Sequence, residues 1–157
     1  MLSFKEYVNE IKSRFSDEVN QDLVFELRGK KLEFKSKNEK NPNNPKYNLF
    51  TYKEALECQK GGWRLPTEEE LHALCRRIFY RLDPRTGNAV FDRCLVLPVC
   101  RYRGNSKVFY VGEKGYYWTS DVYGSDSAWI LKLALTGAGT THCFQYHGLS
   151  VRLVREV

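Results

Sequence analysis

The chain has 157 residues, of which 42% are hydrophobic and 14% aromatic, and it carries a net charge of +6. This composition is typical of one folded domain with a sizeable core, and no apolar run is long enough to cross a membrane. The five cysteines are an odd number without a Cys-x-x-Cys pair, which argues against a disulfide framework and against a zinc site.

The start of the chain has no signal-peptide pattern, so we expect a cytoplasmic or virion-associated protein with reduced thiols, unless an export signal has been removed. Much of the positive charge lies in two stretches, residues 30–46 and 76–85. This positive charge is compatible with a nucleic acid or an anionic surface as a partner. Neither stretch has aromatic residues at the regular spacing that base stacking requires, which favours an ordinary solvated surface.

The first part of the chain predicts a helix and then a hairpin. A Ser-x-x-Glu capping-box pattern precedes apolar residues that recur at helical spacing over residues 4–15. The apolar run 23–27 and the alternating run 32–34 flank a turn-like Arg-Gly-Lys, which indicates a β-hairpin. Residues 36–48 are polar and punctuated by proline, so we expect a loop there.

The middle of the chain predicts two helices joined by a rigid junction. The pattern Thr-x-x-Glu occurs twice, and it predicts helices over about residues 51–60 and 67–80. The junction, residues 61–71, begins with two glycines and an aromatic anchor, Trp63. Pro66 then holds the chain extended just before the second helix is capped.

The C-terminal half predicts strands. The expected strands cover residues 94–99, 116–120, 128–135 and 149–153, with turns near 83–87 and 136–139. In the third of these, bulky residues alternate with period two. Trp129 and three leucines fall on one face, and Ile130 and Lys132 fall on the other.

Three blocks of sequence occur in a fixed order. They are Phe50-Thr51-Tyr52-Lys53-Glu54-Ala55 followed by Gly62-Trp63-Arg64-Leu65-Pro66-Thr67, then Tyr117-Trp118-Thr119-Ser120 with Ala128-Trp129, and last Gly148-Leu149-Ser150-Val151-Arg152-Leu153-Val154-Arg155. Together they resemble the bacterial major paralogous domain family, which has a C-type-lectin-like fold. They are also similar to the variable proteins of diversity-generating retroelements and, more distantly, to the formylglycine-generating-enzyme fold.

The resemblance covers roughly residues 30–157 and implies an α+β, C-type-lectin-like fold. In that fold, helices pack around a small twisted antiparallel sheet whose N- and C-terminal strands are adjacent, so residues 32–34 would pair with 150–153. We therefore divide the chain into an N-terminal helical extension, 1–28, and a lectin-like domain, 29–157. Three tryptophans would then be core anchors: Trp63, Trp118 and Trp129.

In the diversified relatives, the segment between the second and third blocks carries the variable residues that contact ligand. The matching candidates here are Val122, Tyr123, Ser125, Asp126, Ile130, Lys132, Thr140, Thr141, His142, Gln145, Tyr146 and His147. Tyrosine gives contact area at low entropic cost and small polar residues adapt, so this mixture suits a protein or cell-surface ligand. An exposed Ile130 would have no role in folding. The same positions also fit an ordinary domain without diversification.

His142, Cys143 and His147 raise the question of chemistry in this segment. Their spacing matches no zinc pattern, and neighbouring strand residues point to opposite faces, so His142 is poorly placed to activate Cys143. The enzyme relative needs a pair of C-terminal cysteines, and the calcium-binding triplets of true C-type lectins are absent. We therefore predict a non-enzymatic binding module without a metal or cofactor.

Two other functions stay open at this point. The chain could be an interaction or structural subunit that contacts a protein or nucleic acid through its basic helix or its N-terminal helix. It could also be a degenerate enzyme of the formylglycine-generating type that depends on Cys143.

Overall fold

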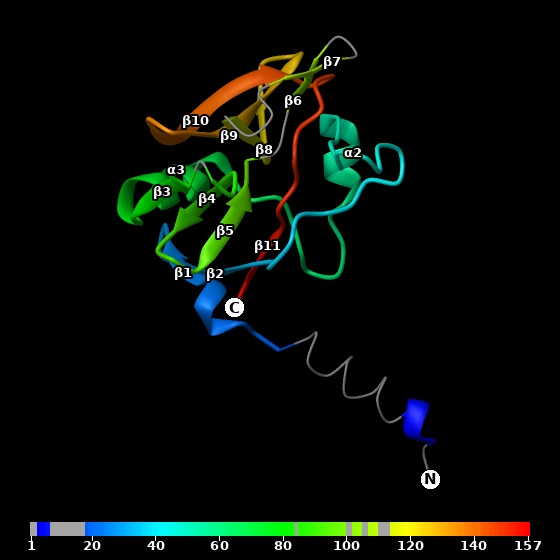
Figure 1. Cartoon of the computed structure of the whole chain (residues 1–157), viewed down its shortest axis with the longest axis vertical. Coiled ribbons are helices and arrows are strands. Elements are labelled where there is room, and N and C mark those ends of the chain that lie inside the picture. Colours follow the sequence, from blue (N-terminus) through cyan, green and yellow to red (C-terminus); the bar gives the residue numbers. More distant parts are fainter. Residues whose placement is uncertain (1–2, 7–17, 84, 100–101, 105–106, 110–113) are drawn as a thin grey trace.

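The computed structural model describes residues 3–6, 18–83, 85–99, 102–104, 107–109 and 114–157 (Figure 1). Its α-helices are α2 (Tyr52–Glu57) and α3 (Glu68–Arg77), and a 3-10 turn, η1, covers Gln21–Leu23. The strands are β1 (Val24–Leu27), β2 (Lys30–Phe34), β3 (Tyr80–Asp83), β4 (Asn88–Phe91), β5 (Leu95–Pro98), β6 (Tyr102–Gly104), β7 (Lys107–Phe109), β8 (Lys114–Tyr123), β9 (Ser127–Ala134), β10 (Gly137–Phe144) and β11 (Val154–Glu156).

The expected C-type-lectin-like α+β fold, with helices packed around one small sheet, is wrong. The described strands form three antiparallel sheets, ordered β1-β2-β11, β3-β4-β5 and β10-β9-β8, together with the hairpin β6-β7. Helices α2 and α3 are short; α3 packs against the β10-β9-β8 sheet and β1, whereas α2 lies at the side of the molecule next to β8 (Figure 1). A whole meander, β3-β4-β5, occupies a stretch for which the sequence indicated a turn and a single strand.

One part of that expectation is confirmed, since the N- and C-terminal strands are adjacent. β11 pairs antiparallel with β2, with Val154 opposite Phe34 and Glu156 opposite Leu32. The predicted register is wrong by several residues. Leu149 bridges instead to Phe50, beside α2, because the chain first runs along β8 before it reaches β2.

The predicted N-terminal hairpin is confirmed as β1 and β2. Phe25 and Leu27 of β1 are buried in the same core as Phe34 of β2. The hairpin therefore crosses the predicted boundary between the N-terminal extension, 1–28, and the domain, 29–157, and it packs residues from both into one core. The first capping box is present over residues 3–6, and the rest of the helix predicted over 4–15 lies outside the described residues.

The junction over residues 61–71 is held by reciprocal hydrogen bonds. The Thr67 hydroxyl accepts the Glu70 amide at 3.1 Å, and the Glu70 carboxylate accepts the Thr67 amide at 2.8 Å. The Arg64 guanidinium donates to both Glu70 oxygens at 2.8 Å. The predicted capping box is therefore confirmed. Helix α3 ends at Arg77, three residues earlier than predicted, because Ile78 is already extended.

The core is divided into two clusters. The larger lies between α3 and the sheets, and the smaller lies between α2, the face of β8 and β9 that it covers, and residues 149–153. Trp118 is fully buried in the smaller cluster, and its indole donates to the Phe50 carbonyl at 2.7 Å. Trp63 and Trp129 are only half-buried, so Trp118 alone among the three is a core anchor of the expected kind.

Candidate ligand-binding face

The β10-β9-β8 sheet carries the segment that the sequence singled out. β8 and β9 join through the turn 124–126, and the register shifts between Trp118 and Val122, which marks a β-bulge. Such bulges redirect side chains next to functional surfaces. β9 and β10 join through the two-residue turn 135–136, so β10 is the outer strand of this sheet.

An aromatic group lies at the β8–β9 end of the sheet, and we call it the hairpin aromatic group. The rings of Tyr123 and His142 stack with centroids 3.8 Å apart and an interplanar angle of 8°. Trp129 meets both of them edge-on, at 5.1 Å from Tyr123 and 5.8 Å from His142. Tyr123 is 43% exposed, so the group offers a rigid aromatic surface to solvent.

A second group lies around the end of β10, and we call it the strand-end aromatic group. Phe144 stacks on Tyr146 at 5.5 Å, and His147 meets both rings edge-on. Phe144 is 45% exposed and Tyr146 is 60% exposed. These rings contribute little to the core, and an exposed apolar cluster of this kind is typical of a contact surface.

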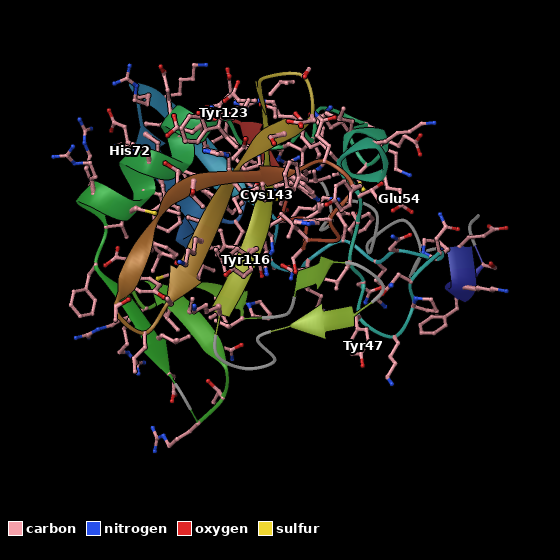
Figure 2. The ribbon with its side chains drawn as sticks, turned by 90° about the horizontal axis from the view of Figure 1, so that it is seen from above. Tyr47, Glu54, His72, Tyr116, Tyr123 and Cys143 are labelled. Carbon is pink, nitrogen blue, oxygen red and sulfur yellow. The ribbon has the colours of Figure 1, made fainter. Side chains whose placement is uncertain are left out.

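A hollow of about 270 Å³ lies on the face of the sheet opposite α3. It is lined by Tyr116, Ile130, Lys132, Thr141, His142, Cys143 and His147. Figure 2 shows Cys143 on β10 and Tyr116 on β8, with Tyr123 beyond them at the hairpin. By the strand register, Tyr116 and Cys143 lie on the face opposite Trp129 and His142, so the hollow and the hairpin aromatic group lie on opposite faces of the sheet.

Burial sets the protonation of the titratable groups in this hollow. It raises the pKa of the Cys143 thiol to about 12, so the thiol is protonated at neutral pH. It lowers the pKa of His147, so that imidazole is neutral there. Lys132 is half-buried, and among the described residues no carboxylate lies within ion-pair distance of its ammonium. The hollow thus places a lysine near a protonated thiol and a neutral imidazole.

The structure divides the predicted ligand-contacting residues into three sets. Six are exposed, namely Val122, Tyr123, Ser125, Asp126, His142 and Tyr146, and five are half-buried, namely Lys132, Thr140, Thr141, Gln145 and His147. Ile130 is only 2% exposed and lies in the smaller core cluster, so the expectation that it faces solvent is wrong. Two other parts of the chain, α2 and residues 149–153, cover Ile130, and neither is adjacent to it in sequence.

Two of the half-buried residues have structural contacts. The Thr140 hydroxyl donates to the Glu68 carboxylate at 2.8 Å, which ties β10 to the first turn of α3. Gln145 donates from its side chain to the Ser127 carbonyl at 2.9 Å and accepts the Tyr52 amide on its own carbonyl at 3.0 Å. Thr140 and Gln145 therefore stabilise the face through these hydrogen bonds and contribute less to its exposed surface.

Sequence reasoning missed Trp129 and Phe144 as members of this face. The lectin-like resemblance implies that Trp129 is a core anchor, whereas the structure leaves it half-buried beside Tyr123 and His142. Phe144 stood in a short mixed stretch with no visible alternation. An aromatic residue next to the closing turn was the one available signal for it.

Other titratable groups lie outside this face. Burial raises the pKa of Cys75 to about 12 and that of Cys58 to about 11. His72 lies on α3 with its Nδ1 3.9 Å from the Glu68 carboxylate. In the part of the chain that the structure describes, no three His, Cys, Asp or Glu side chains are grouped to hold a metal ion, and no helix has the length and apolarity to cross a membrane.

Comparisons of the chain with protein-family models, curated proteins and solved structures gave no match.

Proposed function

We propose that this chain is a ligand-binding module whose contact surface is the exposed part of residues 121–147, and that its ligand is a protein or another cell-surface molecule. One observation carries the proposal. Two stacked aromatic groups, one around Tyr123 at the β8–β9 hairpin and one around Tyr146 after β10, are exposed instead of being packed into the core. Rigid aromatic rings bury much area on binding and lose little conformational entropy.

The electrostatics of the hollow fit binding better than catalysis. A nucleophilic cysteine needs a lowered pKa, and that of Cys143 is raised to about 12. Its strand neighbour His142 points to the opposite face and stacks on Tyr123. The proposal therefore contains no catalytic step, and it also replaces the hypothesis of a degenerate enzyme centred on Cys143.

A binding screen with matched variants tests the proposal. The chain is applied to arrays of cell-surface proteins and of glycans, next to a variant with Tyr123, Phe144 and Tyr146 all changed to alanine. The control is Phe79→Ala, which removes a 68% exposed aromatic ring outside the face. We expect every specific signal to be lost in the triple variant and kept in the control. Signals that survive the triple variant in a folded protein would mean that the assigned face is wrong.

Diversification of this segment by a retroelement is a separate part of the proposal. The exposed residues alternate with buried ones such as Ile130, so only a subset could vary without disturbing the core. The check is the neighbouring genomic DNA. A reverse-transcriptase gene and a near-copy of the codons for residues 116–155, differing at the exposed positions, are expected.

A second candidate function is contact with a nucleic acid or acidic protein through α3. Arg76 and Arg77 line a hollow of about 560 Å³ together with Arg28. Glu68 and Glu69 line it too, and Glu69 lies 3.5 Å from Arg28, so the positive charge is partly neutralised. If this surface binds DNA or RNA, changing both arginines of α3 to glutamine reduces the salt slope of binding by about two.

A further inference from the structure

β10 differs from the other outer strands of the described sheets. It is eight residues long, and its sequence, Gly-Ala-Gly-Thr-Thr-His-Cys-Phe, contains no charged residue and no proline. The outer strands β1 and β3 have four residues each and carry charges, Glu26 in the first, and Arg81 and Asp83 in the second. Charges, prolines and shortness protect sheet edges from unwanted pairing, and β10 has none of them.

The opposite edge of the same sheet is already occupied. The Trp118 amide donates to the Ser150 carbonyl at 3.1 Å, and the Ser150 amide donates to the Tyr116 carbonyl at 3.1 Å. The C-terminal segment thus pairs with β8. Within the described residues, only β10 leaves a long edge of this sheet unpaired.

The hydrogen-bond pattern shows which groups of β10 point outward. The Gln145 amide donates to the Asp126 carbonyl at 2.9 Å, so the pair 145–126 is a hydrogen-bonded one. Hydrogen-bonded pairs alternate with non-hydrogen-bonded pairs along an antiparallel ladder. The amides of Ala138, Thr140, His142 and Phe144 therefore point away from β9, toward the open edge.

The side chains beside this edge differ between the two faces of the sheet. On the α3 face, β10 itself carries two exposed aromatic residues, His142 and Phe144. On the face with the hollow, Gly139 stands directly opposite Lys132. A Cβ atom added at Gly139 would meet nothing within 4 Å, so there is open space between the edge and the lysine.

This gap has a definite charge preference. Lys132 is half-buried without a carboxylate partner among the described residues, and a side chain arriving over Gly139 would reach its ammonium. Strands in a sheet lie about 4.8 Å apart, so an added strand would be about 10 Å from β9, a gap that the two long side chains span together. An aspartate or glutamate at that register is the complementary group.

We propose that the ligand of this face includes an extended acidic peptide segment that adds to the edge of β10 as a fourth strand. Its backbone pairs with the outward amides of β10, and an acidic residue opposite Gly139 contacts Lys132. A large apolar residue of the peptide, three positions from its acidic residue, lies opposite His142 on the α3 face. The inference rests on the proposed function, since it names the chemistry of that ligand, and strand addition is an established mode of peptide recognition.

The first test is selection from a phage-displayed library of random linear peptides on the full chain. We expect enriched sequences to share an Asp or Glu and a large apolar residue three positions apart. A synthetic peptide of this kind is then methylated at one backbone nitrogen at a time. Loss of one hydrogen bond weakens binding about tenfold, so binding should fall at alternate positions and be kept at the positions between them.

Charge reversal tests the contact with the lysine. Lys132→Glu should weaken binding of the acidic peptide at least about tenfold, and a peptide with lysine in place of its acid should then recover it. The control is Lys53→Glu, which changes an exposed lysine on α2. It should change the binding of neither the acidic peptide nor the lysine-substituted peptide. If Lys132→Glu does not fold, Lys132→Met should show the loss without the reversal. Gly139→Val should remove the preference for an acid.

The outcomes separate this inference from the proposed function. Failure to enrich any peptide, or methylation that weakens binding at no alternate set of positions, overturns strand addition. The proposed function is then tested separately, by whether the triple aromatic variant loses binding to the ligands found on the arrays. Alternating loss together with charge reversal at Lys132 confirms the inference.

Discussion

The junction over residues 61–71 and the segment 121–147 use polar and aromatic side chains in opposite ways. In the junction, Arg64, Thr67 and Glu70 satisfy one another, and Glu70 is buried. In the segment, the exposed rings around Tyr123 and Tyr146 stack only within small groups at the surface. The polar side chains of the junction hold the chain together, whereas the exposed rings of the segment remain available for contact with a partner.

The two regions are nevertheless in contact. The Glu68 amide donates to the Asp121 carboxylate at 2.7 Å, and the Thr140 hydroxyl donates to the Glu68 carboxylate. The Ser120 amide donates to the Pro66 carbonyl at 2.9 Å. The start of α3 therefore positions the hairpins, and changes in the two regions should have separable effects. Substitutions in the junction and core should lower stability, and substitutions at exposed rings should lower binding.

The largest expected effect is on the core beneath the face. Trp118→Ala should lower the free energy of unfolding by about 4 kcal/mol, because it leaves a cavity and removes the hydrogen bond to Phe50. The urea midpoint measures the loss. Its matched comparison is Trp129→Ala, a half-buried tryptophan of the same sheet, which should cost less. Equal losses would mean that Trp129 is also a core anchor.

The next effect concerns the ion pair of the junction. Glu70→Ala should cost about 3 kcal/mol, because it leaves Arg64 without its bidentate partner and removes the capping-box acceptor. Glu70→Gln keeps an oxygen for the Thr67 amide and should cost less. Equal urea midpoints for the two variants would mean that the charge carries all of the effect.

A smaller, graded effect is expected from pH. Burial alone would raise the pKa of Glu70, but the hydrogen bonds from Arg64 and Thr67 outweigh it and bring the pKa below its ordinary value of 4.5. The unfolded chain therefore takes up this proton at higher pH than the folded chain. The stabilisation is complete above 4.5 and is lost as the pH falls through the folded-state pKa.

Urea midpoints measured from neutral to acidic pH check this sign. The midpoint of the natural chain should fall on acidification, and that of Glu70→Gln should fall less steeply. Parallel curves for the two proteins would contradict a role for Glu70 in the acid sensitivity.

The smallest effect on stability is expected at the exposed rings. Tyr146→Ala should change the free energy of unfolding by no more than about 0.5 kcal/mol, because the side chain is 60% exposed. Any ligand found in the array screen should nevertheless bind it more weakly. A large loss of stability would show that the strand-end aromatic group supports the fold.

Local signals predicted local structure well. Capping boxes at Ser3, Thr51 and Thr67 are all present, because each depends on side chains and amides within one helical turn. The β1–β2 hairpin was predicted because its turn and its apolar residues are adjacent in sequence. Boundaries were less accurate, and α3 ends earlier than its apolar pattern indicated.

The fold and part of the site were not predictable in this way. The resemblance built on three sequence blocks led to a lectin-like arrangement, whereas the strands form three separate small sheets. The meander β3-β4-β5 was missed because strands of four residues are too short to show a clear alternation. The positions of Trp129 and Phe144 at the surface were missed because alternation alone does not say which face of a strand is covered.

The sequence by itself determined where helices begin, which residues alternate in β9, and that residues 121–147 are rich in side chains suited to contact. These properties depend on neighbours within a few residues. Only the tertiary structure decided that Ile130 is buried, that Tyr123 stacks on His142, and that Gly139 faces Lys132 at an open edge. Each of these depends on which strand or helix packs against which, and that choice is made by burial of the whole core.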